Sequence, residues 1–208
     1  MEEYYRKRAQ EYESVYYRDD PERQLEQRQL AEEMKQAVKG LKVLEVACGT
    51  GYWTQKASET ARSILATDAV EEVVAIAKAK DYSCPVEFEK ADAYSLPYKG
   101  YDAAIANFWI SHVPKERLDN FLKGLHATLK PKGTLFMADN NFIEGIGGEL
   151  LTKEGDRNTY KKRKLKDGTE TEVLKNYFTK KELQQLFGED AEIVYGRCFW
   201  AVTLKAGS

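Results

Sequence analysis

Residues 41–53 read LKVLEVACGTGYW. The first seven of these residues are apolar apart from Lys42 and Glu45, a pattern that predicts a buried β-strand. Gly49 and Gly51 follow directly, and because glycine has no Cβ they allow a tight turn and a close approach of the backbone to a ligand. The residues after this loop have helical spacing. A buried strand, a glycine loop and a helix in this order are typical of the first unit of a parallel α/β sheet.

Towards the C-terminus, apolar runs of strand length alternate with helical segments. The clearest helix is expected over residues 114–130, and Pro131 and Gly133 are expected to end it. Its apolar stripe consists of Leu118, Phe121, Leu122, Leu125 and Leu129. The other expected elements are strands at 63–69, 86–93, 101–109 and 133–140 and helices at 52–61 and 70–80. This alternation predicts right-handed crossovers and a doubly wound sheet that is covered on both faces.

Two helical segments are expected before the first strand. Residues 1–19 are rich in tyrosine and predict a helical lid with an aromatic face. A second helix begins where Asp20 can serve as N-cap and Pro21 suits the first helical position, and it ends at Gly40.

The last third of the chain has a different pattern. Residues 160–177 predict two strands around an Asp167-Gly168 turn, and residues 179–187 predict a short helix. Two final strands follow without a helix between them, which indicates an antiparallel pair. The predicted fold is therefore a Rossmann-like α/β fold, with a doubly wound, mostly parallel seven-stranded sheet, an antiparallel last strand pair and an N-terminal helical lid.

The composition excludes several classes of protein. A chain of 208 residues with 32 Lys plus Arg against 34 Asp plus Glu has the length of one domain and no global attraction for nucleic acid. Its three cysteines form no CxxC pair, so no metal site is expected. The sequence contains no apolar run long enough to cross a bilayer, and a cytoplasmic location is expected.

Acidic residues follow the first two strands. Glu45 lies at the end of the first strand and Asp68 at the end of the second, where a carboxylate can accept both hydroxyls of a ribose. A dinucleotide fingerprint would need glycine where Thr54 stands, and a phosphate-binding P-loop would need Gly-Lys-Ser/Thr. Both of these nucleotide-binding motifs are therefore excluded.

The motif VLEVACGTG resembles the first motif of the class I S-adenosylmethionine-dependent methyltransferases, with Ala47 where many members have glycine. The resemblance continues through Asp68 in ATDAVEEVVAIAKA, Asp92-Ala93 in KADAYSLPY, the fourth-strand stretch YDAAIANFWISHV and the fifth-strand stretch LKPKGTLFMADN. Ala9-x-x-Tyr12 is similar to the pair with which many small-molecule members cover the cofactor. The resemblance spans about residues 5–140.

This resemblance implies an enzyme that binds S-adenosylmethionine and releases S-adenosylhomocysteine. The implied cofactor-binding residues are Tyr12, Glu45, Ala47, Gly49, Gly51, Trp53, Thr54, Asp68, Ala69, Asp92, Ala93 and Asn107. The chain then divides, within a single domain 1–208, into a lid (1–40), a cofactor-binding core (41–140), an acceptor-side insert (141–178) and a final helix with antiparallel strands (179–208).

The expected acceptor is a small molecule methylated at O, N or S. Methyl transfer favours a dry site lined by aromatic groups. The expected acceptor-binding residues are Tyr16, Tyr17, Phe108, Trp109 and Asn140. Where the acceptor must lose a proton, the candidate catalytic bases are His112 and Asp139.

Two other functions stay open at this point. The basic cluster at 161–164, with Lys166, could direct the enzyme to RNA or protein, although Glu170 and Glu172 can pair with it across the turn. Residues 107–110 read NFWI and lack the prolines of base-methylating members, which argues against methylation of a base. The chain could also bind the cofactor without turnover. A monomer or a homodimer is expected.

Overall fold

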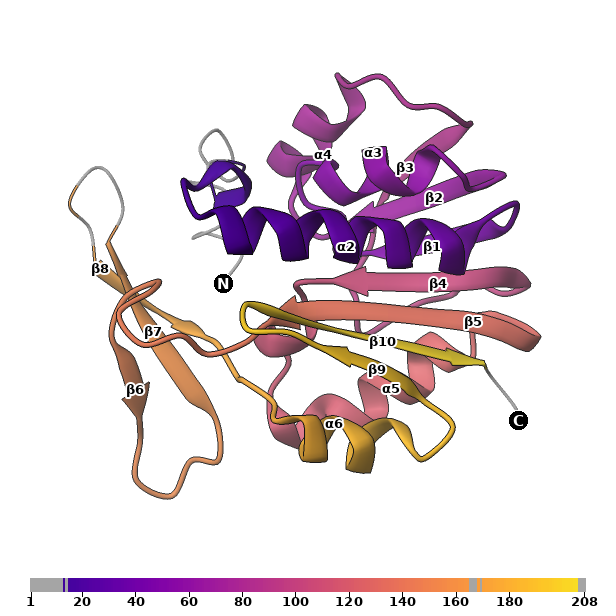
Figure 1. Ribbon diagram of the computed structural model, residues 1–208. Helices are drawn as coiled ribbons and strands as arrows, with labels where there is room; N and C mark the ends of the chain where they lie inside the picture. The colour runs from indigo at the N-terminus through magenta and orange to yellow at the C-terminus, as the bar shows by residue number, and fades with distance from the viewer. Residues whose placement is uncertain (1–12, 14, 165–167, 169, 206–208) are drawn as a thin grey trace.

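The main sheet has seven strands in the order β3-β2-β1-β4-β5-β10-β9, and it is parallel from β3 to β5 (Figure 1). The computed structural model describes residues 13, 15–164, 168 and 170–205. The parallel strands are β1 (Lys42–Val46), β2 (Ser63–Asp68), β3 (Val86–Lys90), β4 (Tyr101–Asn107) and β5 (Leu129–Asn140). The reversal of strand order beside β1 creates a switch point, where open α/β sheets bind their ligands.

The antiparallel end of the sheet is confirmed. Strand β10 (Phe199–Lys205) pairs antiparallel with both β5 and β9 (Glu192–Tyr195). Helix α6 (Lys180–Phe187) precedes β9 and begins with a capping box, in which the Thr179 hydroxyl accepts from the Glu182 amide. The predicted seven-stranded, Rossmann-like sheet is therefore correct.

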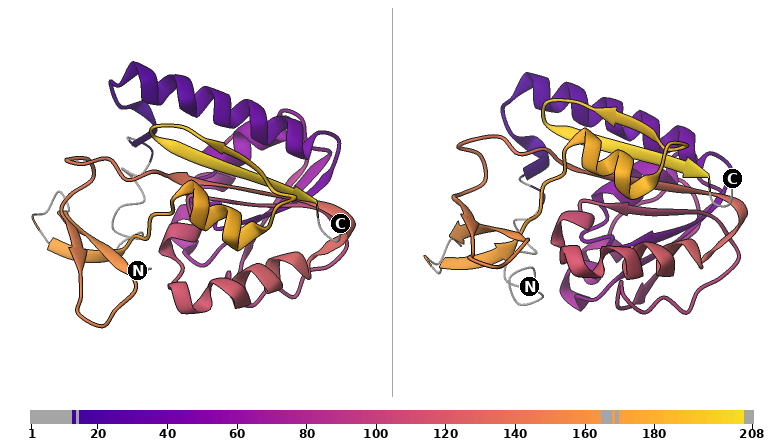
Figure 2. Two further views of the ribbon diagram at one scale, coloured as in Figure 1. Left: turned by 60° about the horizontal axis from the view of Figure 1, so that its bottom comes forward. Right: turned by 90° about the horizontal axis from the view of Figure 1, so that it is seen from below.

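The helices cover the two faces of the main sheet because successive strand residues point to opposite sides (Figure 2). Helices α2 (Pro21–Val38) and α3 (Tyr52–Ser58) pack on one face, where Val43 and Ile105 contribute to the core. Helices α5 (Leu118–His126) and α6 pack on the other face, against Leu44 and Leu135. Helix α4 (Glu71–Lys78) follows β2.

Helix α2 begins as predicted, since the Asp20 side chain accepts from the Arg23 amide at 3.0 Å and Pro21 occupies the first turn. The structure covers only part of the predicted lid. Residues 15–17 form a 3₁₀ turn, and residues 1–12 lie outside the described residues. Among the helices that the structure describes, none has both the length and the apolar character that a membrane span requires.

The predicted helix over residues 114–130 is wrong at both ends. A 3₁₀ turn (Lys115–Arg117) replaces its start, and α5 ends at His126. Leu129 instead pairs with Tyr101 as the first residue of β5. Lys132 takes a left-handed φ of 62°, and the register shifts between Tyr101 and Ala103. Strand β5 therefore passes through Pro131 and Gly133 at an irregularity in its pairing with β4, where a sheet tolerates proline.

The insert after β5 forms a second sheet of three strands, which stands beyond the carboxyl ends of β4 and β5 (Figure 1). Strands β7 (Thr159–Lys164) and β8 (Glu170–Leu174) form the predicted antiparallel pair, and β6 (Leu150–Thr152) is an additional strand. The turn between β7 and β8 is described only at Gly168.

Candidate active site

A cavity of about 220 Å³ opens at the carboxyl ends of β1 to β4. We call it the cofactor cavity. Its walls include the following predicted cofactor residues: Glu45, Ala47, Gly49, Trp53, Asp68, Ala69, Asp92, Ala93 and Asn107. Gly51 and Thr54 do not line it, and Tyr12 lies outside the described residues. The sheet thus brings together the ends of four strands at the place that the glycine loop predicts.

The backbone of the glycine loop is held in the left-handed region. Gly49 has a φ of 56° and Gly51 a φ of 81°. A Cβ on Gly51 would lie 2.5 Å from the Tyr82 hydroxyl, so only glycine fits there. Ala47 adopts a φ of 56° without being glycine. Such a conformation is costly for a residue with a Cβ and is tolerated where the surrounding structure imposes it.

Asp68 is oriented by two backbone amides. The Gly49 amide donates to its Oδ2 at 2.9 Å, and the Val70 amide donates to its Oδ1 at 2.9 Å. Because both oxygens accept from backbone amides, the glycine loop and the start of α4 orient this carboxylate in the wall of the cofactor cavity. Asp92, which follows the neighbouring strand β3, accepts from the Tyr94 amide at 2.9 Å.

Glu45 is 2 % exposed, and among the residues that the structure describes none forms a hydrogen bond with its Oε2. Burial raises the pKa of this carboxyl to about 8, and the nearby Asp68 charge adds to the effect. Three further buried atoms in the same wall also lack partners: Trp53 Nε1, Asn107 Oδ1 and Trp109 Nε1. Buried polar groups in native proteins are almost always paired, so this wall fits a ligand that supplies cationic and polar groups, as S-adenosylmethionine does.

The N-terminal segment closes over this cavity with aromatic rings. Tyr16 stacks on Tyr52 with ring centroids 4.0 Å apart, and Phe108 stacks on Trp53 at 5.3 Å. Phe108 has a φ of 58°, which is unusual for a bulky residue and directs its ring toward this cluster. The segment is tied to the glycine loop because the Thr50 hydroxyl donates to Glu13 Oε1 at 2.7 Å.

A second cavity of about 100 Å³ adjoins the first, and Tyr16, Phe108 and His112 line both. We call it the acceptor-side cavity. The structure places predicted acceptor residue Asn140 in its wall and Trp109 in the wall of the cofactor cavity. Tyr17 lines neither cavity and is 69 % exposed.

His112 is buried between the two cavities. Its Nδ1 lies 2.7 Å from the Leu174 carbonyl oxygen. Because a carbonyl can only accept, Nδ1 carries the proton and Nε2 bears the lone pair of the neutral ring. Burial, together with the neighbouring Lys175 charge, lowers the pKa of His112 to about 3. His112 is therefore uncharged near neutral pH.

Asp139 lines neither cavity and is 0 % exposed. Lys175 Nζ lies 2.9 Å from its Oδ1, and the Ser111 amide donates to its Oδ2 at 3.0 Å. Burial alone would raise the pKa of this carboxyl, but the Lys175 and His112 groups hold it below the ordinary value. The carboxylate thus anchors Lys175 and the backbone around Ser111.

The basic cluster of the insert does not form one charged surface. Lys161 is 1 % exposed and donates to the carbonyls of Ile146 and Gly148. Lys162 pairs with Glu170 at 2.7 Å, as expected from the cross-strand acids. Arg163 lines the acceptor-side cavity. Lys164 is exposed, and Lys166 lies outside the described residues.

Sequence reasoning missed several lining residues. Those of the cofactor cavity are Cys48, Val73, Ala91 and Tyr94, and those of the acceptor-side cavity include Arg18, Arg23, Lys175 and Tyr177. A signal was available for Arg23. It lies four residues before Gln27 and seven before Leu30, on the face of α2 that is buried. A cation at a buried helical position indicates a functional or structural partner.

Comparisons with known proteins agree with this geometry. A family model described as a methyltransferase domain matches residues 43–133. The demethylmenaquinone methyltransferase of Staphylococcus aureus strain MRSA252 is 26% identical over an alignment of 178 positions, which covers 75% of this chain and 69% of that protein.

Two solved structures share nearly the whole fold. The SAH complex of DhpI superimposes with a TM-score of 0.78 at 26% identity, covering 97% of this chain and 93% of DhpI. The PH0226 protein of Pyrococcus horikoshii OT3 gives a TM-score of 0.75 at 20% identity, with 98% of each chain covered.

Proposed function

The chain belongs to the class I S-adenosylmethionine-dependent methyltransferases, and from this premise we propose that it methylates O, N or S of a small molecule held in the acceptor-side cavity. One observation carries the proposal: the two cavities share the wall formed by Tyr16, Phe108 and His112. A group bound in one cavity therefore lies next to a group bound in the other. We place the enzyme in the cytoplasm, as a monomer or homodimer.

The cofactor supplies an electrophilic methyl group on a positively charged sulfur. Glu45 faces the cofactor cavity with an unpartnered oxygen, and we assign it to a cationic group of the cofactor. Asp68, held by the amides of Gly49 and Val70, is assigned to the ribose hydroxyls. The remaining cofactor assignments follow the cavity lining, and those of Tyr12, Gly51 and Thr54 rest on the family resemblance alone.

On the acceptor side, Tyr16 and Phe108 exclude water from the junction of the cavities. His112, fixed by the Leu174 carbonyl, presents Nε2 as the acceptor of a hydrogen bond and orients the acceptor. Asn140 and Trp109 complete the walls. Asp139 is a positioning residue, because it acts through Lys175 and the Ser111 amide.

Calorimetric titration with S-adenosylmethionine tests the cofactor half of the proposal. Asp68→Ala should weaken binding by about 1.5 to 3 kcal/mol, the worth of hydrogen bonds to a charged group, or at least about tenfold in Kd. Asp119→Ala removes an exposed carboxylate of α5 and is the matched control. Equal affinities of the two variants, with both folded by circular dichroism, would remove Asp68 from the site.

Incubation with methyl-labelled S-adenosylmethionine and a small-molecule extract tests the transfer half. Label should appear in a small-molecule fraction. Label recovered only on RNA or protein would contradict the proposal, and cofactor binding without any labelled product would favour a non-catalytic binder.

A further inference from the structure

The acceptor-side cavity is lined by several cations and by no acid among the residues that the structure describes. Its basic lining residues are Arg18, Arg23, Arg163 and Lys175. The Lys175 charge is balanced from behind by Asp139, which lies outside the lining. Within the described part of the chain, Arg23 and Arg163 have no carboxylate within ion-pair distance. An excess of positive charge therefore faces the cavity.

Arg23 is held rigidly at one wall. It is 8 % exposed, its Nη2 donates to Asn140 Oδ1 at 3.2 Å, and its guanidinium lies 4.4 Å from the Phe199 ring centroid. Its buried Nε has no hydrogen-bond partner within the described part of the chain. Because about nine in ten buried polar groups in native proteins are paired, this donor indicates a group that is supplied by a ligand.

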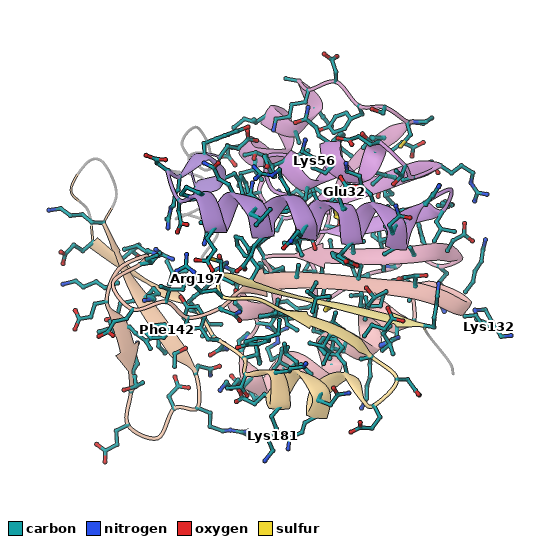
Figure 3. All side chains as sticks on the ribbon, viewed as in Figure 1. Glu32, Lys56, Lys132, Phe142, Lys181 and Arg197 are labelled. Carbon is teal, nitrogen blue, oxygen red and sulfur yellow. The ribbon has the colours of Figure 1, made fainter. Side chains whose placement is uncertain are left out.

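Arg163 lies on strand β7 of the insert, a different element from that of Arg23, and is half-buried. Gly147 packs against it so closely that a Cβ there would lie 2.8 Å from Arg163 Nη1. Phe142 marks the place where the chain passes from the main sheet into this insert (Figure 3). The loop around Gly147 is held by Lys161, whose Nζ donates to the Gly148 carbonyl at 2.7 Å. The insert thus fixes Arg163 at the cavity wall.

The arginine charges at this cavity affect the pKa of two neighbouring groups. Burial is the main cause that lowers the pKa of both His112 and Lys175, and the charge of Arg163 lowers both further. The charge of Arg23 also contributes to the lowered pKa of Lys175. The charges of Arg23 on α2 and Arg163 on β7 therefore both reach the region around Lys175.

We propose that the acceptor-side cavity binds an anionic group of the methyl acceptor, an oxyanion of the carboxylate or phosphate type, between Arg23 and Arg163. This inference rests on the proposed function, since it names the class of acceptor for the same site. The planar guanidinium is suited to such oxyanions because it can donate two parallel hydrogen bonds to them. A cavity of about 100 Å³ has room for such a group.

The test uses the full chain and three probes: acetate, inorganic phosphate and acetamide, which is the uncharged counterpart of acetate. Each is titrated at constant ionic strength, with and without saturating S-adenosylhomocysteine. Acetate or phosphate should bind the wild type, and acetamide should not. Arg163→Gln and Arg23→Gln should each weaken that binding at least tenfold. Arg28→Gln, at an exposed position of the same helix α2, should leave it unchanged.

The outcomes separate the two hypotheses. Binding of neither acetate nor phosphate, or equal binding by wild type and Arg163→Gln, would overturn the inference. Equal binding of acetamide and acetate would overturn it as well. The same titrations measure S-adenosylhomocysteine affinity, which Arg163→Gln should not change. A chain that binds the anions but not S-adenosylhomocysteine would contradict the proposed function and leave the anion site in place.

Discussion

Replacing Glu45 by glutamine should remove a pH-dependent cost to folding. The carboxyl is buried, and its pKa rises from 4.5 to about 8 in the folded protein without cofactor. A raised pKa means that the contribution of this group is fully present below the ordinary value and is lost as the pH rises toward the folded value. Glutamine has nearly the same shape and cannot ionise.

The magnitude follows from these two pKa values. Between pH 4.5 and 8 the unfolded state has lost a proton that the folded state still holds. The free energy of unfolding of the wild type should therefore fall, relative to Glu45→Gln, by about 1.4 kcal/mol per pH unit. From pH 4.5 to neutral pH this amounts to about 3 kcal/mol.

The assay is urea denaturation of both proteins at a series of pH values from about 5 to about 7.5, without cofactor. Glu189→Gln, at an exposed position, is the matched control and should follow the wild type within about 0.5 kcal/mol. Parallel stability curves for wild type and Glu45→Gln would refute the reasoning, because they would show that Glu45 titrates alike in both states. Calorimetry should also find weaker S-adenosylhomocysteine binding by Glu45→Gln than by Glu189→Gln.

Three further predictions concern the frame of the site. Lys175→Met leaves the Asp139 carboxylate buried without its cation and should lower the unfolding free energy by about 3 to 5 kcal/mol. The double variant Lys175→Met/Asp139→Asn should regain most of this loss. Equal stability of the single and double variants in urea denaturation would contradict the prediction. Phe108→Gly should be about 1 kcal/mol more stable than Phe108→Ala in urea denaturation, the reverse of an ordinary position, because φ is 58°. Asp20→Ala removes the N-cap of α2 and should lower the unfolding free energy by about 1 kcal/mol, whereas an unchanged midpoint would argue against the cap.

The main sheet could be predicted because its signals are local. Strands β1, β2 and β4 are short, mostly apolar runs, and helices α2 and α6 carry their own N-cap residues. The error at residues 114–130 has the same origin. Leu129 continues the apolar stripe of α5 by spacing alone, but its pairing with Tyr101 is a contact across the sheet that spacing cannot reveal. The pairing of β5 with β4 therefore limits how far α5 can extend.

The cofactor wall was predictable for a related reason. In a doubly wound sheet the ends of neighbouring parallel strands meet at one edge, so Glu45, Asp68 and Asn107 come together once the strands are assigned. The acceptor wall has no such rule. Arg23 lies on α2 and Arg163 on β7 of the insert, and only the three-dimensional fold brings both to one cavity. For the same reason the pairing of Asp139 with Lys175 could not be read from the sequence.

The state of His112 and the charge of the acceptor-side cavity point to the same chemistry. A ring whose pKa is about 3 takes a proton poorly from an alcohol or an amine, so His112 is a weak general base. An oxyanion acceptor needs no base, because it already carries the electron pair that forms the new bond to carbon. Burial and the nearby cations make His112 a poor base, and Arg23 and Arg163 supply the positive charge and the N–H donors that bind an oxyanion. Transfer to a carboxylate held there, at saturating S-adenosylmethionine, should therefore show no rate dependence on His112 ionisation above about pH 5. A rise in rate between about pH 5 and 8 that the wild type shows and His112→Asn lacks would contradict this reasoning.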